Sequence, residues 1–488
     1  MNIVDLTIKK VHGSLIKKEF SALELTKAFL DRIKKRNKEI NAVITLDEKG
    51  ALNQAEEIDS LISQKIDIPI LAGIPCLIKD NIMVKGLKCT AASKILADYV
   101  APYNASVINS LNKAGSVILG KANLDEFAVG SSGEYSTFGP TANPFDIEKV
   151  SGGSSSGPGA SVGDNQCLFS LASDTGGSIR LPASFCGAVG FKPTYGAVSR
   201  YGLIALASSL DQIGPITRNV EDAKLVFETI SASDNMDSTK IKEKIPKYPS
   251  MESLKGVVVG VPKELFPLSS SSINSEIEEA ISPEVKEKTK ESIEKMRDAG
   301  AEIREINLPH TSYALAVYYI IMSSELSSNL ARYDGIKYGH SASEEKINDL
   351  ADVYLKSRAE GFGEEIRRRV MLGTYTLSAG YYDEYYVKAQ KVRSLIREDF
   401  KKAFKEVDLV LTPISPTLPF KFGEKMSNPL SMYLSDVFMI PANLAGLPAI
   451  SLPVGKCNNL PIGINLMGEN MQDFKLLEIA KLLEKIYA

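Results

Sequence analysis

The stretch that decides the fold runs from Ser151 to Pro182 and reads SGGSSSGPGASVGDNQCLFSLASDTGGSIRLP. Two loops rich in glycine and serine flank one short apolar run, Cys167 to Ala172. Because glycine permits positive φ and close backbone approach, each loop can bend its amides around a small group. The apolar run is too short for a helix of its own and is typical of a buried strand or a helix turn. We therefore expect a scaffold that presents serine hydroxyls and backbone amides at one point.

The segments before this stretch alternate between helix and strand patterns. A capping box at residues 21–24, SALE, predicts a helix. The apolar run Ile68–Ile78, which leads directly into Lys79, predicts a strand with a bent entry. Ser106–Ala114 is typical of a helix and Ser116–Leu119 of the next strand. Such alternation favours an α/β sheet covered by helices.

The second half of the chain adds a helical region and several late strands. The pattern over residues 313–405 is almost wholly helical, and the serine run Ser269–Ser272 predicts an exposed loop. The late strands can rejoin the first sheet, so we predict a single domain over residues 1–488 with a largely helical insertion around 313–405. Their patterns lie at Val407–Leu411, Ala449–Leu452 and Ile462–Leu466.

The composition is that of an ordinary globular protein, with 44% hydrophobic and 24% charged residues. The 57 basic and 60 acidic side chains leave a formal charge of −3, so any RNA is expected to rest on another chain. Five scattered cysteines form no metal-like cluster and indicate a reducing compartment. The sequence contains no apolar run of membrane-spanning length and no pattern of a targeting peptide. We expect a cytoplasmic protein that binds neither metal nor membrane.

Two known kinds of functional loop, the nucleophile elbow and the phosphate-binding loop, match this stretch poorly. GSSSG at residues 153–157 matches the nucleophile elbow of α/β-hydrolases, with Ser155 as the nucleophile, but the residues before it are turn-like rather than an apolar strand. That elbow also needs a histidine, and the chain has only His12, His310 and His340. The loop fails as a phosphate cradle because no Gly-Lys-Ser/Thr follows its glycines.

A neutral lysine can activate a serine in place of histidine. An unperturbed lysine has a pKa of ~10.4, and burial can lower that pKa by roughly 3–5 units. Lys79 ends an apolar run and can therefore lie at the inner end of a strand, whereas Asp80 should point to the opposite face of the sheet. A lysine after a strand is, taken alone, more often a surface residue.

The second loop, DTGGSIR from Asp174, offers a place for negative charge. Its consecutive amides, two of them on glycine, can form a nest for a developing oxyanion next to Ser178. Asp174 and Arg180 bracket the loop and can pair to brace it. The amides in question belong to Thr175, Gly176 and Gly177.

These residues resemble the signature of the amidase signature family. The similar segments are GGSSSGPGA from Gly152, DTGGSIRLP from Asp174 and KDN from Lys79. The resemblance implies the amidase signature fold, a central mixed β-sheet with helices on both faces. It also implies a Ser-Ser-Lys triad, in which Ser178 is the acylated nucleophile, Ser154 relays the proton from behind a cis peptide bond, and Lys79 is the base. The nest of amides would then be the oxyanion hole.

Further segments are similar to one branch of that family, the A subunits of aspartyl/glutamyl-tRNA amidotransferases. The resemblance runs nearly end to end and departs at an apparent insertion, Ser269–Ile281, and at Leu181, where a polar residue is usual. A free-standing amidase for another small amide, or a catalytically silent scaffold, remains an alternative. The similar segments include EFAVGSS from Glu126, SSNLARYDG from Ser327, GTYTLSAGYYD from Gly373 and NLAGLPAIS from Asn443.

This branch implies a glutaminase inside a heterotrimer, in which the partners are the B and C subunits of the amidotransferase. Glutamine would be hydrolysed to glutamate and ammonia on this chain, and the ammonia would pass through a tunnel to the B subunit. There Glu-tRNA(Gln), activated with ATP and Mg²⁺, would be amidated, so this chain itself would need no cofactor. Arg358 would bind the glutamine α-carboxylate and Asp436 its ammonium, because a guanidinium forks onto a carboxylate and a carboxylate accepts from an amine.

Overall fold

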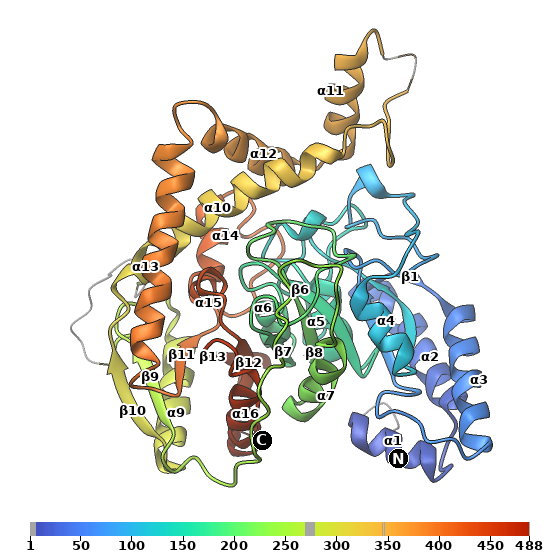
Figure 1. Ribbon diagram of the computed structural model, residues 1–488, viewed down its shortest axis with the longest axis vertical. Coiled ribbons are helices and arrows are strands. Elements are labelled where there is room, and N and C mark those ends of the chain that lie inside the picture. Colours follow the sequence, from blue (N-terminus) through green and yellow to red (C-terminus); the bar gives the residue numbers. More distant parts are fainter. Residues whose placement is uncertain (1–5, 269–278, 344, 346, 488) are drawn as a thin grey trace.

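The computed structural model describes residues 6–268, 279–343, 345 and 347–487 (Figure 1). Its centre is an 11-stranded sheet of parallel and antiparallel strands, flanked by helices. This confirms the predicted α/β class with a central mixed sheet. The strands, in their order across the sheet, are β1 (Val43–Leu46), β3 (Val117–Ala122), β2 (Pro75–Lys79), β6 (Phe169–Asp174), β8 (Gln212–Thr217), β7 (Val189–Lys192), β12 (Ala449–Cys457), β13 (Leu460–Gly468), β11 (Leu409–Pro413), β9 (Val258–Pro262) and β10 (Glu302–Ile306).

A small two-stranded sheet, β4 (Ala142–Asn143) with β5 (Asp146–Val150), leads into the first of the two loops, residues 151–157, which we call the serine loop. The serine run at 269–272, and most of the apparent insertion that contains it, lie outside the described residues. The α-helices with their bounds are α1 (Ile8–Ile16), α2 (Ala22–Ile40), α3 (Glu48–Ser63), α4 (Ser106–Lys113), α5 (Ser156–Gly163), α6 (Arg180–Phe185), α7 (Val220–Ile230), α9 (Pro283–Asp298), α10 (Ala314–Asn329), α11 (Leu350–Gly361), α12 (Glu364–Leu377), α13 (Lys388–Ala403), α14 (Pro429–Tyr433), α15 (Ile440–Ala445) and α16 (Asp473–Tyr487).

The capping box predicted at residues 21–24 forms in the structure, whereas the strand predicted at Ile68–Ile78 has different bounds. At the start of α2, Ser21 Oγ accepts a hydrogen bond from Glu24 N at 3.0 Å, and Ser21 N donates to Glu24 Oε2 at 2.8 Å. Strand β2 is shorter than the predicted Ile68–Ile78, because the chain turns before Pro75 with Gly73 at a φ of 74°. A positive φ of this kind ends the extended conformation, so the strand begins only after the turn.

The central stretch folds as loop, helix, strand, loop, helix. The apolar run becomes the fully buried strand β6, which settles the choice between strand and helix turn. Strand β2 pairs in parallel with β6, with Cys76 opposite Phe169. Because parallel strands end at the same edge of a sheet, Lys79 at the end of β2 and Asp174 at the end of β6 lie along one edge.

The late strands join the same sheet, as predicted. Strand β12 pairs with β7, placing Ala449 opposite Lys192, and thereby connects the two halves of the chain. Leu409 and Leu411 belong to one buried apolar cluster and Val410 to another, so strand β11 buries side chains on both faces of the sheet. The single-domain assignment itself stays a prediction.

The region predicted to be helical, 313–405, contains α10, α11, α12 and α13, which lie at the top and along one side of the view (Figure 1). A π-helical turn, Asp383–Val387, leads into α13. Among the described residues, no helix is both long enough and apolar enough to cross a membrane. All five cysteines are free thiols, and only Cys457 is not buried.

Candidate active site

Lys79 ends strand β2 with its side chain fully buried. Its Nζ atom lies 2.9 Å from Ser154 Oγ, 2.8 Å from Ser155 Oγ and 3.0 Å from Ser173 Oγ. A neutral amine has two N–H donors and one lone pair, which matches three surrounding hydroxyls. The structure therefore brings together the lysine and the first serine that the sequence predicts; their catalytic roles stay predictions.

The charge of Lys79 is set by its surroundings. Burial lowers the pKa of its amine to about 7, against the opposing effect of the negative charges of Asp125, Asp174 and Asp211. Asp80, the next residue, does not hold the proton on Lys79, because its carboxylate pairs with Lys121 Nζ at 2.9 Å. At neutral pH about half of such amines are unprotonated, so Lys79 can act as a base.

Two contacts of Lys79, with Ser155 and Ser173, were not assigned from the sequence. Ser155 Oγ donates its proton to the carbonyl of Ser173 at 3.1 Å, so it can only accept from Lys79. Ser173 Oγ also accepts from Asn81 Nδ2 at 3.0 Å. Ser154 is thus the neighbour best able to give Lys79 a proton. Asn81 could have been predicted from the segment KDN, because side chains two residues apart on a strand lie on the same face.

The two loops meet at the serines. The Gly153–Ser154 peptide bond is cis, as the resemblance implies, and Ser155 N donates to the carbonyl of Ser178 at 3.2 Å. Ser154 and Lys79 are 0% exposed, whereas Ser178 is 9% exposed. A substrate arriving from solvent can reach only the hydroxyl that is accessible, which favours Ser178 as the nucleophile.

Asp174 braces the second loop from inside. Its carboxylate pairs with Arg180 Nε at 3.1 Å, and Asn443 Nδ2 donates to it at 2.8 Å. Burial would raise its pKa, but the charge and hydrogen bond of Arg180, together with the charge of Lys192 and the hydrogen bond from Asn443, lower the pKa to about 2. Asp174 also accepts from Gly177 N at 2.8 Å. The Gly177 amide is therefore occupied, which differs from its predicted place in the oxyanion hole.

The amides of Gly176 and Ser178 are better placed than that of Gly177 to receive an oxyanion. Gly176 N and Ser178 N donate to no other group within the described chain. A Cβ atom at Gly176 would lie 2.5 Å from Tyr318 Oη, so only glycine leaves the loop this close to α10. Thr175 Oγ1 donates to Asp211 Oδ1 at 2.7 Å and fixes the other end of the nest.

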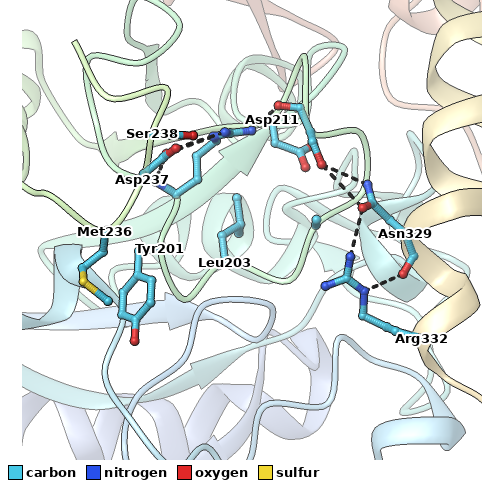
Figure 2. A pocket seen from close by; sticks show the side chains of 11 residues that line it. Tyr201, Leu203, Asp211, Met236, Asp237, Ser238, Asn329 and Arg332 are labelled. Atoms are coloured by element: carbon cyan, nitrogen blue, oxygen red, sulfur yellow. Dashed lines mark hydrogen bonds and ion pairs between the residues drawn. The ribbon is translucent and has the colours of Figure 1, made fainter.

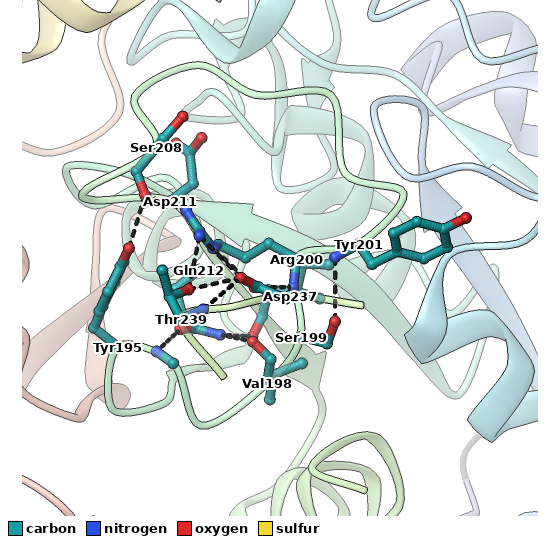
Figure 3. Close-up of polar contacts among 12 residues, drawn as sticks. Tyr195, Val198, Ser199, Arg200, Tyr201, Ser208, Asp211, Gln212, Asp237 and Thr239 are labelled. Atoms are coloured by element: carbon teal, nitrogen blue, oxygen red, sulfur yellow. Dashed lines mark hydrogen bonds and ion pairs between the residues drawn. The ribbon is translucent and has the colours of Figure 1, made fainter. Parts of the chain in front are cut away.

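Asp211 also lines a hollow of about 290 Å³ next to the nest (Figure 2). The charged groups around this hollow all have hydrogen-bond partners within the described chain. Arg200 donates to Asp237 from Nε at 3.1 Å and to Thr239 Oγ1 from Nη2 at 2.7 Å (Figure 3). Arg332 Nε donates to the carbonyl of Asn329 at 2.7 Å. The network stiffens the wall behind the oxyanion loop, and we assign it no ligand.

Leu181, where the resemblance departs, makes no polar contact. Its side chain is fully buried in an apolar cluster with Phe185 and Met439. The bracing of the loop thus depends on Asp174 and Arg180 and does not require a polar side chain at this position.

Arg358 and Asp436, the predicted substrate-binding pair, have different surroundings. Arg358 lies on α11, where its Nη1 atom donates to the carbonyls of Leu330 at 2.7 Å and Tyr333 at 3.0 Å. Asp436 is buried, and its carboxylate accepts from Ser131 Oγ at 2.5 Å. Burial raises the pKa of Asp436 to about 7. No hydrogen bond or ion pair joins these two residues, and their roles in binding the substrate stay predictions.

A second arginine, Arg369 on α12, acts on Asp436, and sequence reasoning missed it. Its positive charge lowers the pKa of Asp436, against the effect of burial. Its guanidinium lies 4.1 Å from the centre of the Tyr433 ring, and its Nε donates to Glu365 at 2.7 Å. Its Nη1 atom is buried and has no partner among the residues that the structure describes. The sequence contained no signal for Arg369, because Glu364 and Arg368 form an i, i+4 pair of the same spacing on the exposed face of the helix.

The chain belongs to the amidase family, whose model, described as Amidase, matches residues 24–477. It is 51% identical to the A subunit of the glutamyl-tRNA(Gln) amidotransferase of Thermoanaerobacter pseudethanolicus, over 99% of this chain and 97% of that relative. The A subunit of the enzyme of the same name from Thermotoga maritima has a solved structure with a TM-score of 0.80 and 40% identity, covering 99% of this chain and 95% of that chain. The peptide amidase of Stenotrophomonas maltophilia gives a TM-score of 0.79 at 26% identity, covering 99% and 97%. These similarities confirm the resemblance noted in the sequence.

Proposed function

We propose that this chain is the glutamine-hydrolysing A subunit of a glutamyl-tRNA(Gln) amidotransferase. The observation that carries the proposal is the buried Lys79 amine, 2.9 Å from the Ser154 hydroxyl, in a chain that is 51% identical over 487 residues to a protein of that name. Glutamine and water would give glutamate and ammonia on this chain. The ammonia would then be used on a partner chain to convert Glu-tRNA(Gln) to Gln-tRNA(Gln).

The contact between Lys79 Nζ and Ser154 Oγ supports the following proton path in this proposal. Free Lys79 accepts a proton from Ser154 Oγ, and Ser154 in turn accepts one from Ser178 Oγ, which attacks the carboxamide carbon of glutamine. The negative charge that forms on the carboxamide oxygen is stabilised by the amides of Gly176 and Ser178. The proton returns through Ser154 to the leaving nitrogen, and ammonia departs. Water then attacks the glutamyl ester on Ser178 by the same path, releasing glutamate.

The polar ends of glutamine require a cation and an anion. Arg369 has an unused, buried N–H donor that can join its guanidinium to the α-carboxylate, and Asp436 can accept from the ammonium. Both groups are desolvated, so pairing with the substrate offsets part of the cost of burying each of them. In this proposal Arg369 replaces Arg358 as the carboxylate-binding residue.

The partners belong to the same proposal. We assign ATP and Mg²⁺ to the B subunit, with the C subunit completing a heterotrimer in the cytoplasm. A formal charge of −3 supports placing the tRNA mainly on a partner. A free-standing amidase would share the triad but has no need of a matched cation and anion for an amino acid substrate, which disfavours that alternative.

The test is ammonia release from glutamine by the complex that contains Ser178→Ala. We expect loss of activity with the fold retained, because the variant lacks only the attacking oxygen. Ser161→Ala is the matched control, since Ser161 is a buried serine whose hydroxyl donates to its own helix at Pro158 O, 3.0 Å away. Turnover by Ser178→Ala equal to that of the control would refute the proposal. Purification without co-eluting partner chains would favour the free-standing amidase.

A further inference from the structure

We propose that two neighbouring carboxylates, Asp125 and Glu126, are positioning residues that tie the serine loop to the helix that holds the substrate. Asp125 fixes the backbone that carries Ser154, and Glu126 fixes the first turn of α12, which carries Arg369. The inference rests on the proposed function for the identity of the substrate, whereas the coupling itself is a property of the fold.

The Asp125 carboxylate fixes the fold of its own segment, residues 125–135, and the backbone of that segment contacts the serine loop. The carboxylate accepts from Gly133 N and from Tyr135 N, each at 3.0 Å, and the Asp125 amide donates to the carbonyl of Ser154 at 3.1 Å. The side chain is fully buried. A Cβ atom at Gly153 would lie 2.0 Å from Asp125 Oδ2, so the loop approaches the carboxylate as closely as a glycine allows. Asp125 therefore sets the position of the cis segment that presents Ser154.

Glu126 holds the start of α12. Gly363, the residue before the helix, donates from its backbone nitrogen to Glu126 Oε2 at 2.9 Å, and Ser93 Oγ donates to Glu126 Oε1. The helix has no side-chain cap of its own at this end. A Cβ atom at Gly363 would lie 2.4 Å from Glu126 Oε2. A carboxylate at a helix N-terminus satisfies a free amide and complements the helix dipole, so Glu126 acts as the cap from outside.

The segment from 125 to 135 thereby contacts both the serine loop and the groups proposed to hold the substrate. Besides the two carboxylates, its Ser131 donates to Asp436 at 2.5 Å and accepts, through its carbonyl, from Gly153 N at 2.9 Å. Arg369 lies on the helix that Glu126 caps. The distance between the nucleophile and the groups that hold the far end of the substrate is therefore set by one short segment.

The partners of the two carboxylates predict opposite responses to the same chemical change. Both partners of Asp125 are backbone N–H groups, which can only donate, so Asp125→Asn would place an NH₂ group against a donor. One partner of Glu126 is the hydroxyl of Ser93, which also lies 3.1 Å from the carbonyl of Gly361. That hydroxyl can donate to the carbonyl and accept from an amide, so Glu126→Gln keeps the contact with Ser93 and the 2.9 Å hydrogen bond from Gly363 N, and loses only the longer contact of that N–H at 3.2 Å. Glu126→Ala loses them all.

The experiment measures glutamine hydrolysis by the complete complex carrying each variant. We expect Asp125→Asn to lower kcat about 100-fold with KM changed less than about threefold, because the proton path is misaligned. We expect Glu126→Ala to raise KM about tenfold or more with kcat nearly unchanged, because Arg369 shifts relative to Ser178. Glu126→Gln should match wild type. Equal losses in kcat for Glu126→Ala and Glu126→Gln, or an unchanged KM for Glu126→Ala, would overturn the inference.

Amide hydrogen exchange separates this inference from the proposed function. Glu126→Ala should accelerate exchange in the first turn of α12 while leaving α2 unchanged, and Glu126→Gln should not. If the wild-type complex releases no ammonia from glutamine, the proposed function fails and exchange alone tests the coupling. Unchanged exchange in α12 of Glu126→Ala would then overturn it, and loss of protection throughout the chain would show a purely structural role and overturn it as well.

Discussion

Lys79 and Lys121 lie on adjacent parallel strands with fully buried side chains, yet their amines differ in how firmly they hold a proton. Burial by itself would lower the pKa of both amines. At Lys121 the negative charge of Asp80, 2.9 Å away, contributes to raising the pKa in spite of burial. At Lys79 the nearest groups are serine hydroxyls, and the pKa falls to about 7. Burial therefore lowers the pKa of a lysine far enough to make it a base only where no carboxylate contacts the amine.

The largest expected effect comes from removing the unpaired lysine. Lys79→Ala should lower kcat for glutamine hydrolysis by about 10³-fold or more, because the proton of Ser154 then has no acceptor. Steady-state ammonia release measures the loss. A kcat within tenfold of wild type would show that another group is the base and would break the comparison.

Removing the paired lysine should instead affect stability. Lys121→Ala leaves Asp80 buried without its cation, which costs about 3–5 kcal/mol of unfolding free energy. Urea unfolding of the chain gives the value, and the kcat of the folded fraction should stay near that of wild type. A variant as stable as wild type would indicate that the pair contributes no more than an exposed one does.

Two arginines extend the comparison from lysines to guanidinium groups. Arg369 has an unused donor, whereas Arg358 is held by two carbonyls. Arg369→Ala should raise the KM for glutamine by about 100-fold, as expected when a charged hydrogen bond worth roughly 2–3 kcal/mol is lost. Arg358→Ala should change KM less than about threefold. The reverse result would restore the assignment made from the sequence.

The smallest effect is a pH dependence. Lys79 accepts a proton only when unprotonated, so kcat should fall as the pH decreases through about 7 and reach a plateau at higher pH. One pH unit below that pKa, kcat should be about tenfold below the plateau. Protonation of free Asp436, whose pKa is also about 7, should appear in KM instead. A kcat that is flat from pH 6 to 8 would contradict a base with this pKa.

Some of this site could be predicted from residues close together in the sequence. The segment KDN follows an apolar run, so the two-residue period of a strand already separates Lys79 from Asp80. The signature segments likewise indicated that the two loops meet, and the hydrogen bond from Ser155 N to the carbonyl of Ser178 joins them. These predictions depend on local periodicity and on loops that tolerate little variation, both of which are visible without a structure.

Other features depend on contacts that local patterns do not contain. The Gly177 amide is occupied because the Asp174 side chain accepts from a residue three positions further along, a detail of loop geometry. Arg358 and Arg369 both lie on helices of similar pattern, and the corner at 361–363 between α11 and α12 separates their surroundings. Ser173 joined the site only because β6 pairs with β2, which is a long-range contact.

The pairing of β7 with β12 joins early and late parts of the chain, and this has a consequence during protein synthesis. The loop that begins at Asp174 leaves the ribosome long before Asn443, which donates a hydrogen bond to Asp174, and before Asp436, which is proposed to bind the substrate. A polypeptide still in synthesis therefore lacks the Asn443 contact to Asp174 and the Asp436 contact to Ser131 until its last quarter has been made.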